Sequence, residues 1–307
     1  MRVLVAGASG FVGKRLCDAL AEHHDVRAMT RRPDSYRGAG TAVGADVADE
    51  DSLLSAGAGC DAAYYLVHSL GQRDFETRDA DAARAFARAA AANGLRRIVY
   101  LGGLGDDDDQ LSMHLRSRRE VESLLGSTDV EVTTLRAGII VGAGGISWEL
   151  TRQLVEHLPV MITPRWVQTR TQPIAVADVV RYLVEILELP EAQSRSFDIG
   201  GPDVLRYIDM LRRVAAIEGR RMLVIPVPLL SPRLSSRWLS LVTDVDVQTG
   251  RSLIDSMTNE VVVRDDSIRR LVDFEPMDYD SAVLQALGER ARAKRDAAAS
   301  KSTAGRR

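Results

Sequence analysis

A glycine-rich turn between a strand and a helix constrains the fold of this chain more than any other segment. Residues 2–6 predict a strand: after Arg2, residues 3–6 are apolar without alternation, which is typical of a strand buried on both faces. Residues 7–13 follow directly and contain three glycines. Gly7 allows a tight turn, Gly10 lets bare backbone approach a ligand, and Gly13 lets a helix pack close to the strand. This spacing predicts the phosphate-binding corner of a dinucleotide fold.

The residues after the turn predict an amphipathic helix. Val12, Leu16 and Leu20 share one face, whereas Lys14 and Asp18 lie off it. The N-terminus of such a helix offers unpaired N–H groups and the positive end of the helix dipole, and both favour an anion. A turn that uses glycine only for its geometry is the alternative, which the flanking strand and helix make the weaker interpretation.

Strand-like and helical runs alternate through the first half of the chain. We expect strands at 25–29, 41–43, 62–67, 97–101 and 131–135, and helices at 49–55, 75–93 and 111–125. Alternating strand–helix units of this kind predict a Rossmann-type, doubly wound parallel sheet with helices on both faces, in the α/β class.

The pattern changes after residue 141 and predicts a smaller C-terminal lobe. We expect residues 1–141 to form the dinucleotide-binding Rossmann domain and residues 142–287 to form mainly a substrate lobe. Within the second segment, a helix and a strand between residues 176 and 201 are expected to return to the Rossmann sheet. Residues 288–307 are basic and have nothing apolar to bury, so a disordered tail is expected there.

The composition excludes several classes of function. The formal net charge of -3 gives no reason to expect nucleic acid as a partner. Cys17 and Cys60 do not make a disulfide framework, and we expect both in the core. The five histidines lack the spacing of metal ligands, so we expect no metal site.

The chain shows no pattern of export or of membrane insertion. Its first residues lead directly into the predicted strand, so we expect no signal peptide. The nearest candidate for a membrane span, residues 222–242, is interrupted by prolines and arginines. We interpret it as a wall of the substrate lobe, with a membrane- or partner-facing surface as the alternative. We expect a cytoplasmic protein. Its partner is expected to be either a small-molecule substrate or a regulatory protein.

The ends of the second and third strands indicate which dinucleotide fits. Residues 29–33 lack the acid that would hold the ribose 2′-hydroxyl of NAD, and Arg31 and Arg32 stand there instead. Their planar guanidinium groups suit a phosphate, so NADP(H) is favoured over NAD(H). After the third strand, Asp46 could accept from the adenine amino group, with Val47 against the ring. Asp46 could equally cap the next helix.

The fourth strand ends at residues 66–69, at the crevice where ligands of open α/β sheets bind. We expect Leu66 and Val67 to contact the cofactor. His68 stands at the same place and is a candidate acid, although a hydrogen bond to a loop is an equally simple role for it.

Taken together, these motifs resemble the atypical or extended short-chain dehydrogenase/reductases, specifically their NmrA-like NAD(P)H-binding branch. The resemblance covers roughly residues 1–290 and is carried by residues 7–13, 31, 46–47, 65–69, 135–142, 172–179 and 197–202. It implies an NADP(H) site in which the loop 136–140 flanks the nicotinamide end. Ala137, Gly138 and Ile139 would therefore contact the cofactor.

The resemblance breaks at the catalytic residues. Active members use serine, tyrosine and lysine, but no lysine lies between Arg15 and Ala293. The helix expected to carry the tyrosine and lysine has His114 and Arg118 at four-residue spacing, which places both on one face. His114 is a candidate proton donor, and Arg118 a candidate group to hold the ribose or a carbonyl oxygen. A surface pair without a catalytic role is the alternative.

Two functions follow from these patterns. The first is an NADPH-dependent oxidoreductase that lacks the usual triad and acts on a carbonyl or an activated double bond. The second is a non-catalytic NADP(H)-binding redox sensor or assembly factor. The predicted cofactor-binding residues are Gly7, Ser9, Gly10, Phe11, Val12, Gly13, Arg31, Arg32, Asp46, Val47, Leu66, Val67, Ala137, Gly138 and Ile139, and the candidate catalytic residues are His114, Arg118 and His68.

Overall fold

Seven strands form the main sheet in the order β11-β6-β5-β4-β1-β2-β3, and every pair of neighbours is parallel. In the computed structural model, residues 1–69, 72, 74–106, 110–163, 165–226, 243–244 and 247–304 are described. The strands are β1 (Arg2–Ala6), β2 (Asp25–Thr30), β3 (Thr41–Gly44), β4 (Ala62–Tyr65), β5 (Arg97–Gly103), β6 (Glu131–Ala137) and β11 (Ser196–Ile199). The order reverses at β1, which confirms the predicted doubly wound fold.

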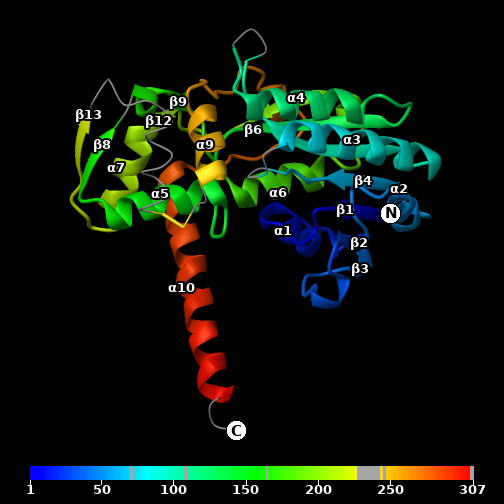
Figure 1. Cartoon of the computed structure of the whole chain (residues 1–307), viewed down its shortest axis with the longest axis horizontal. Coiled ribbons are helices and arrows are strands. Elements are labelled where there is room, and N and C mark those ends of the chain that lie inside the picture. Colours follow the sequence, from blue (N-terminus) through cyan, green and yellow to red (C-terminus); the bar gives the residue numbers. More distant parts are fainter. Residues whose placement is uncertain are drawn as a thin grey trace.

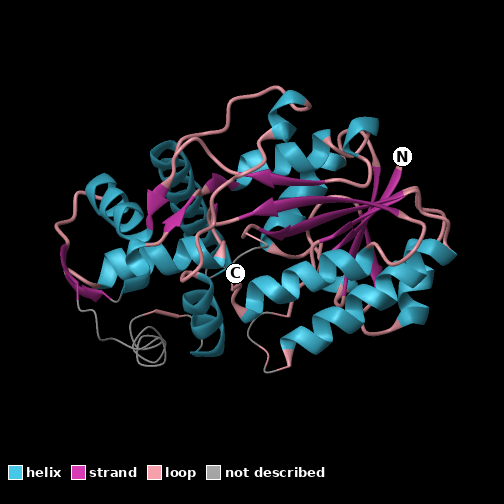
Figure 2. Ribbon diagram, turned by 90° about the horizontal axis from the view of Figure 1, so that it is seen from above, coloured by secondary structure: helices cyan, strands magenta, loops and turns pink. Residues whose placement is uncertain are grey.

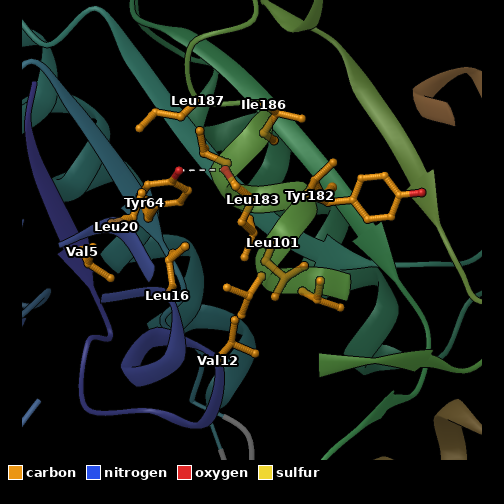
Figure 3. Packing of buried hydrophobic residues seen from close by; sticks show 14 of the residues in the cluster. Val5, Val12, Leu16, Leu20, Tyr64, Leu101, Tyr182, Leu183, Ile186 and Leu187 are labelled. Atoms are coloured by element: carbon orange, nitrogen blue, oxygen red, sulfur yellow. Dashed lines mark hydrogen bonds between the residues drawn. The ribbon is translucent and has the colours of Figure 1, made fainter. Parts of the chain in front are cut away.

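Helices cover both faces of this sheet, as Figure 2 shows. One face carries α1 (Phe11–Leu20) and α6 (Val176–Glu185), and the other carries α2 (Glu50–Gly57), α3 (Phe75–Ala92) and α4 (Met113–Leu125). On the first face, Leu16 and Leu20 of α1 pack with Leu183 of α6 and with Tyr64 of β4 (Figure 3). The Tyr64 hydroxyl donates to the Leu183 carbonyl at 2.8 Å and so ties α6 to the sheet.

The second lobe is a helical layer with three short two-stranded sheets. Its helices are α5 (Ile146–His157), α7 (Tyr207–Ile217), α9 (Val247–Ser256) and the first turns of α10 (Tyr279–Ala304). The strand pairs are β7 (Ile140–Val141) with β10 (Ile174–Ala175), β8 (Val160–Thr163) with β13 (Leu223–Pro226), and β9 (Arg170–Thr171) with β12 (Leu205–Arg206). Short 3₁₀ turns occupy Pro33–Ser35, Arg165–Gln168, Pro190–Ala192 and Ser267–Arg270. Of the proline-rich segment singled out in the sequence, residues 227–242 lie outside the described residues.

The last helix differs from the expectation of a disordered tail. Tyr279 and Val283 are buried in the second lobe, and α10 then continues to Ala304, away from the body of the molecule (Figure 1). Residues 288–304 are therefore helical, because alanine, arginine and lysine extend a helix that packing has already started. Among the described helices, none combines the length and the apolar content that a membrane crossing requires.

Candidate cofactor-binding site

A cavity of about 780 Å³ opens at the carboxyl ends of β1 to β4. Nine of the predicted site residues line it: Gly7, Ser9, Gly10, Arg31, Asp46, Val47, Leu66, Val67 and His68. We call this cavity the nucleotide groove. Its position, outside the carboxyl ends of the strands and beside the point where the strand order reverses, is the usual ligand position in an open α/β sheet.

The glycine-rich turn has the geometry that an approaching phosphate needs. Gly7 has a φ of +91°, a conformation that other L-residues rarely adopt. A Cβ on Gly13 would lie 2.2 Å from the Gly7 carbonyl oxygen, so only glycine allows α1 to start this close to the turn. Gly10 is the N-cap of α1 and supplies no side-chain cap, and the first turn of the helix carries no acidic residue. The N-terminal N–H groups can therefore bind an anion.

Phe11, Val12 and Gly13 of the same motif shape the turn instead of lining the groove. Val12 is buried in the core between α1 and the sheet. Phe11 turns towards the second lobe: a Cβ on Gly145 would lie 2.8 Å from its ring, and the Arg15 guanidinium lies 4.8 Å from the ring centre. Their cofactor-binding role therefore remains a prediction.

At the end of β2, Arg31 lines the groove and its side chain is exposed. Within the described part of the chain its guanidinium makes no hydrogen bond or ion pair. Arg32 is exposed as well but does not contribute to the groove lining; its backbone N–H donates to Thr30 Oγ1 at 3.3 Å. The structure thus brings Arg31, and not Arg32, together with the glycine-rich turn.

Asp46 and Val47 line the groove at the end of β3. The Asp46 carboxylate accepts the Ala48 N–H at 3.0 Å, within its own turn. The next helix is capped by Asp49, whose carboxylate accepts the Ser52 N–H at 3.3 Å. Because Asp49 is the cap, the Asp46 carboxylate keeps acceptor capacity beyond its bond to Ala48.

The two histidine candidates carry strongly lowered pKa values. Loss of hydration, followed by the charge of Arg118, lowers the pKa of His68 to about 4. Loss of hydration, then Arg118 and His68, lowers the pKa of His114 to about 3. His68 is open to the groove, but protein on its other sides still disfavours the protonated ring. Both imidazoles are neutral at pH 7 and can donate a hydrogen bond, so neither is an imidazolium acid.

Arg118 is fixed to β5. Its guanidinium donates to the Leu101 carbonyl and lies 5.0 Å from the centre of the Tyr100 ring. The Tyr100 hydroxyl in turn donates to the Arg118 carbonyl at 3.2 Å. Arg118 is therefore a positioned charge beside His68 and His114. Neither His114 nor Arg118 belongs to the groove lining.

A buried acid that the sequence analysis did not select holds the loop after β4. The Asp79 carboxylate accepts the Ser69 N–H at 2.8 Å, and burial raises its pKa. Ser69 lines the groove beside His68. One feature of the sequence could have identified Asp79: it is an acidic residue on the apolar face of α3, where Phe75 and Ala83 are buried.

The loop predicted to flank the nicotinamide lies at the end of β6, apart from the groove lining. The Ala137 carbonyl accepts the Leu104 N–H, and the Ile139 carbonyl accepts the Ile174 N–H, both at 2.9 Å. Gly138 packs against Val261, which a Cβ at this position would meet at 3.4 Å. Among the described residues, no cluster of three histidine, cysteine, aspartate or glutamate side chains could hold a metal ion.

Comparison with known proteins gives a family match and several relatives. The profile of the NAD(P)H-binding family matches residues 7–190. An uncharacterized protein of Mycobacterium tuberculosis is 29% identical over 232 residues, which are 75% of this chain and 25% of that protein. The chain thus spans about a quarter of the length of the first curated relatives it matches.

One relative and one solved structure are named reductases. The (4-alkanoyl-5-oxo-2,5-dihydrofuran-3-yl)methyl phosphate reductase of Streptomyces griseus is 27% identical over 231 residues, 71% of this chain and 74% of that enzyme. The NADPH-dependent quinone oxidoreductase of Escherichia coli, solved with NADPH, superposes with a TM-score of 0.75 at 19% identity, over 92% of this chain and 98% of that chain. The likeness to the solved structure is one of fold.

Proposed function

Because this chain belongs to the NAD(P)H-binding family, in the NmrA-like branch of the short-chain dehydrogenase/reductases, we propose that it is an NADPH-dependent oxidoreductase without the usual serine–tyrosine–lysine triad. NAD(P)H binding is the property of the family. The preference for NADPH and the reaction are the proposed parts, and both rest on the residues around the nucleotide groove.

The proposed preference for NADPH over NADH rests on one observation, the exposed side chain of Arg31 at the groove. Its guanidinium has no protein partner among the described residues, and residues 29–33 contain no acid to receive a ribose 2′-hydroxyl. A planar guanidinium binds a phosphate with two parallel hydrogen bonds, which a hydroxyl cannot match. The 2′-phosphate of NADPH is therefore the group that Arg31 would hold, while the helix terminus at Gly10 would face the pyrophosphate.

The residues near the expected nicotinamide position restrict which reaction the protein can catalyse. When bound, the cofactor supplies a hydride from its nicotinamide ring. The loop from Ala137 to Ile139 would flank that ring, and neutral His68 or His114 would donate a hydrogen bond to the substrate oxygen. Neither histidine is protonated at pH 7, so the proton comes from water. Arg118 would stabilise the oxyanion by its charge.

Because neither histidine is protonated at pH 7, a suitable substrate is one that delocalises its negative charge after it accepts the hydride. In a carbonyl conjugated to a carbon–carbon double bond, the hydride adds to carbon and the π electrons move to oxygen, giving an enolate. An enolate is a weaker base than an alkoxide, so it needs no strong acid beside it. The dihydrofuranone and quinone in the names of the two reductases above both contain such a conjugated carbonyl.

Fluorescence titration with NADPH and NADH tests the proposal. Wild-type protein should bind NADPH at least about 10-fold more tightly than NADH, the scale of one charge-assisted contact. Arg31→Ala should lose most of this difference. Arg32→Ala is the matched comparison, and its effect should be smaller because Arg32 does not line the groove.

Binding should be followed by turnover. A simple quinone added to the NADPH complex should oxidise the bound cofactor in the wild type. Equal affinity for the two cofactors would contradict the NADPH preference, and absence of binding would contradict the proposed function as a whole.

The non-catalytic alternative is favoured by one observation: a neutral histidine, His114, stands on the helix expected to carry the usual proton relay. A redox sensor must bind NADPH and NADP⁺ with different affinities, because a ligand that binds two states equally shifts neither. A large difference between these affinities, together with no oxidation of cofactor by any conjugated carbonyl, would support the sensor.

A further inference from the structure

One wall of the nucleotide groove is a face of α3 that the proposed function does not use. Residues at helical spacing along this face line the groove: Arg78, Asp81, Ala82, Arg84, Ala85 and Arg88. The two alanines in the middle leave room, and the three arginines give this wall a positive character.

Two of these arginines are neutralised within the protein. Arg84 pairs with Asp81 at 3.0 Å and lies 3.8 Å from Glu120 of α4. Arg88 pairs with Glu50 of α2 at 2.7 Å, and its Nε also donates to the same carboxylate. Both guanidinium groups therefore have acidic partners and serve to join α3 to its neighbours.

Arg78 is different. Its side chain is exposed at the groove, and within the described ranges its guanidinium makes no hydrogen bond or ion pair. The adjacent Asp79 feels its charge, but the Asp79 carboxylate is buried and already accepts from Ser69. Arg78 thus presents an available cation to the same cavity as Arg31.

Two available guanidinium groups in one cavity favour a ligand with more than one anionic group. NADPH carries a 2′-phosphate and a pyrophosphate. Arg31 lies at the end of β2, whereas Arg78 lies one turn into α3, whose first turn follows the loop after β4. The two side chains approach the groove from different elements and can bind different oxygens.

We infer that Arg78 is a second phosphate-binding residue of the nucleotide groove and determines cofactor affinity from the α3 side. The inference rests on the proposed NADPH site. Its ligand is a phosphate of the dinucleotide, either the 2′-phosphate beside Arg31 or the pyrophosphate beside the glycine-rich turn.

Binding of NADPH and NADH to full-length Arg78→Gln and Arg84→Gln tests this inference. Both variants remove one positive charge from the same helix, so any long-range effect of charge is shared. Only Arg78→Gln should raise the Kd for NADPH, by about 10-fold, the size of one charge-assisted hydrogen bond. Arg84→Gln should change it less than about twofold, because its charge is paired.

The response to NADH identifies the phosphate. A loss confined to NADPH assigns Arg78 to the 2′-phosphate, and an equal loss for both cofactors assigns it to the pyrophosphate. Unchanged NADPH binding by Arg78→Gln, or equal losses in both variants, would overturn the inference while the proposed function stands. If the wild type binds neither cofactor, the proposed function fails first and the inference fails with it.

Discussion

At the scale of single residues, the fixed positive charge around the groove comes from arginine alone. The only lysines are Lys14, Lys294 and Lys301, so every cation that lines the groove is a guanidinium. A guanidinium stays charged at all working pH values and binds phosphate as a fork. It cannot take up or release a proton as a desolvated lysine does. The site is thus built for holding an anionic ligand more than for moving a proton.

The two histidines predict how stability depends on pH. Their pKa values are about 4 and 3 in the folded protein, below the ordinary histidine value. As the pH falls from about 6.5 to 4, the unfolded chain takes up these protons first, so folded stability decreases. The His114 proton contributes a slope of up to about 1.4 kcal/mol per pH unit, and the contribution of the exposed His68 is smaller because solvent screens its charge.

Urea unfolding of the wild type and of His68→Gln/His114→Gln between pH 8 and pH 4 measures this effect. The double variant should lose less stability over the acid half of the range. An identical slope in both proteins would show that these side chains do not have depressed pKa values.

The sequence could predict the part of the site that follows strand ends. Gly7, Arg31 and Asp46 stand within two residues of strand ends, so their positions at one edge of the sheet follow from topology, and all three line the groove. The sequence could not predict that the Arg78 guanidinium makes no ion pair within the described ranges and can bind a ligand. Whether an arginine of α3 is paired depends on acids such as Glu50, which comes from another helix.

At the scale of elements, the apolar strands were the most predictable. The strand at Arg2–Ala6 has the expected bounds, because the glycine-rich turn ends its apolar run. The strand at Ser196–Ile199 lies within the segment expected to return to the main sheet. Helix α10 was not predicted, because its helical state depends on burial of Tyr279 and Val283 against the second lobe. The paired two-residue strands carry no local signal and depend wholly on tertiary contacts.

The contact between α1 and the turn before it predicts a strong effect of Gly13→Ala. The new methyl group would meet the Gly7 carbonyl at 2.2 Å, and both partners are backbone, so the helix itself must move. We expect a loss of about 1–3 kcal/mol in the free energy of unfolding, as for overpacking, together with weaker NADPH binding.

Chemical denaturation measures the first effect and fluorescence titration the second. Gly288→Ala in α10 is the control, because nothing lies within 4 Å of its added Cβ. It should be neutral or should stabilise the helix by up to about 1 kcal/mol. A Gly13→Ala protein as stable as the wild type would contradict the close approach of α1.

At the scale of the whole molecule, the two lobes have adjoining cores. Ile174 packs in the core between α1 and the sheet, whereas its neighbour Ala175 packs in the core of the second lobe. Arg15 of α1 also pairs with Glu289 of α10 at 2.8 Å. A disturbance in one core therefore reaches the other directly, and we expect the chain to unfold as one unit.

This coupling predicts the response to cofactor. At a free NADPH concentration of 100 Kd, the free energy of unfolding should rise by about 2.7 kcal/mol. For a chain of this size the midpoint should rise by roughly 5 °C. Differential scanning calorimetry should show a single transition that moves as a whole. Two transitions, of which only one moves, would contradict the coupling, and NADH at equal concentration is the control.

The edge of the main sheet has a consequence for synthesis of the protein. β6 ends at Ala137, but its outer neighbour β11 begins only at Ser196. At about 5–20 residues per second, a ribosome needs roughly 3–12 s to translate the segment between them. Throughout that interval the outer edge of β6 has no strand of its own chain to pair with and is open to another nascent chain. A chaperone that binds this edge would have to release it only after β11 has left the ribosome.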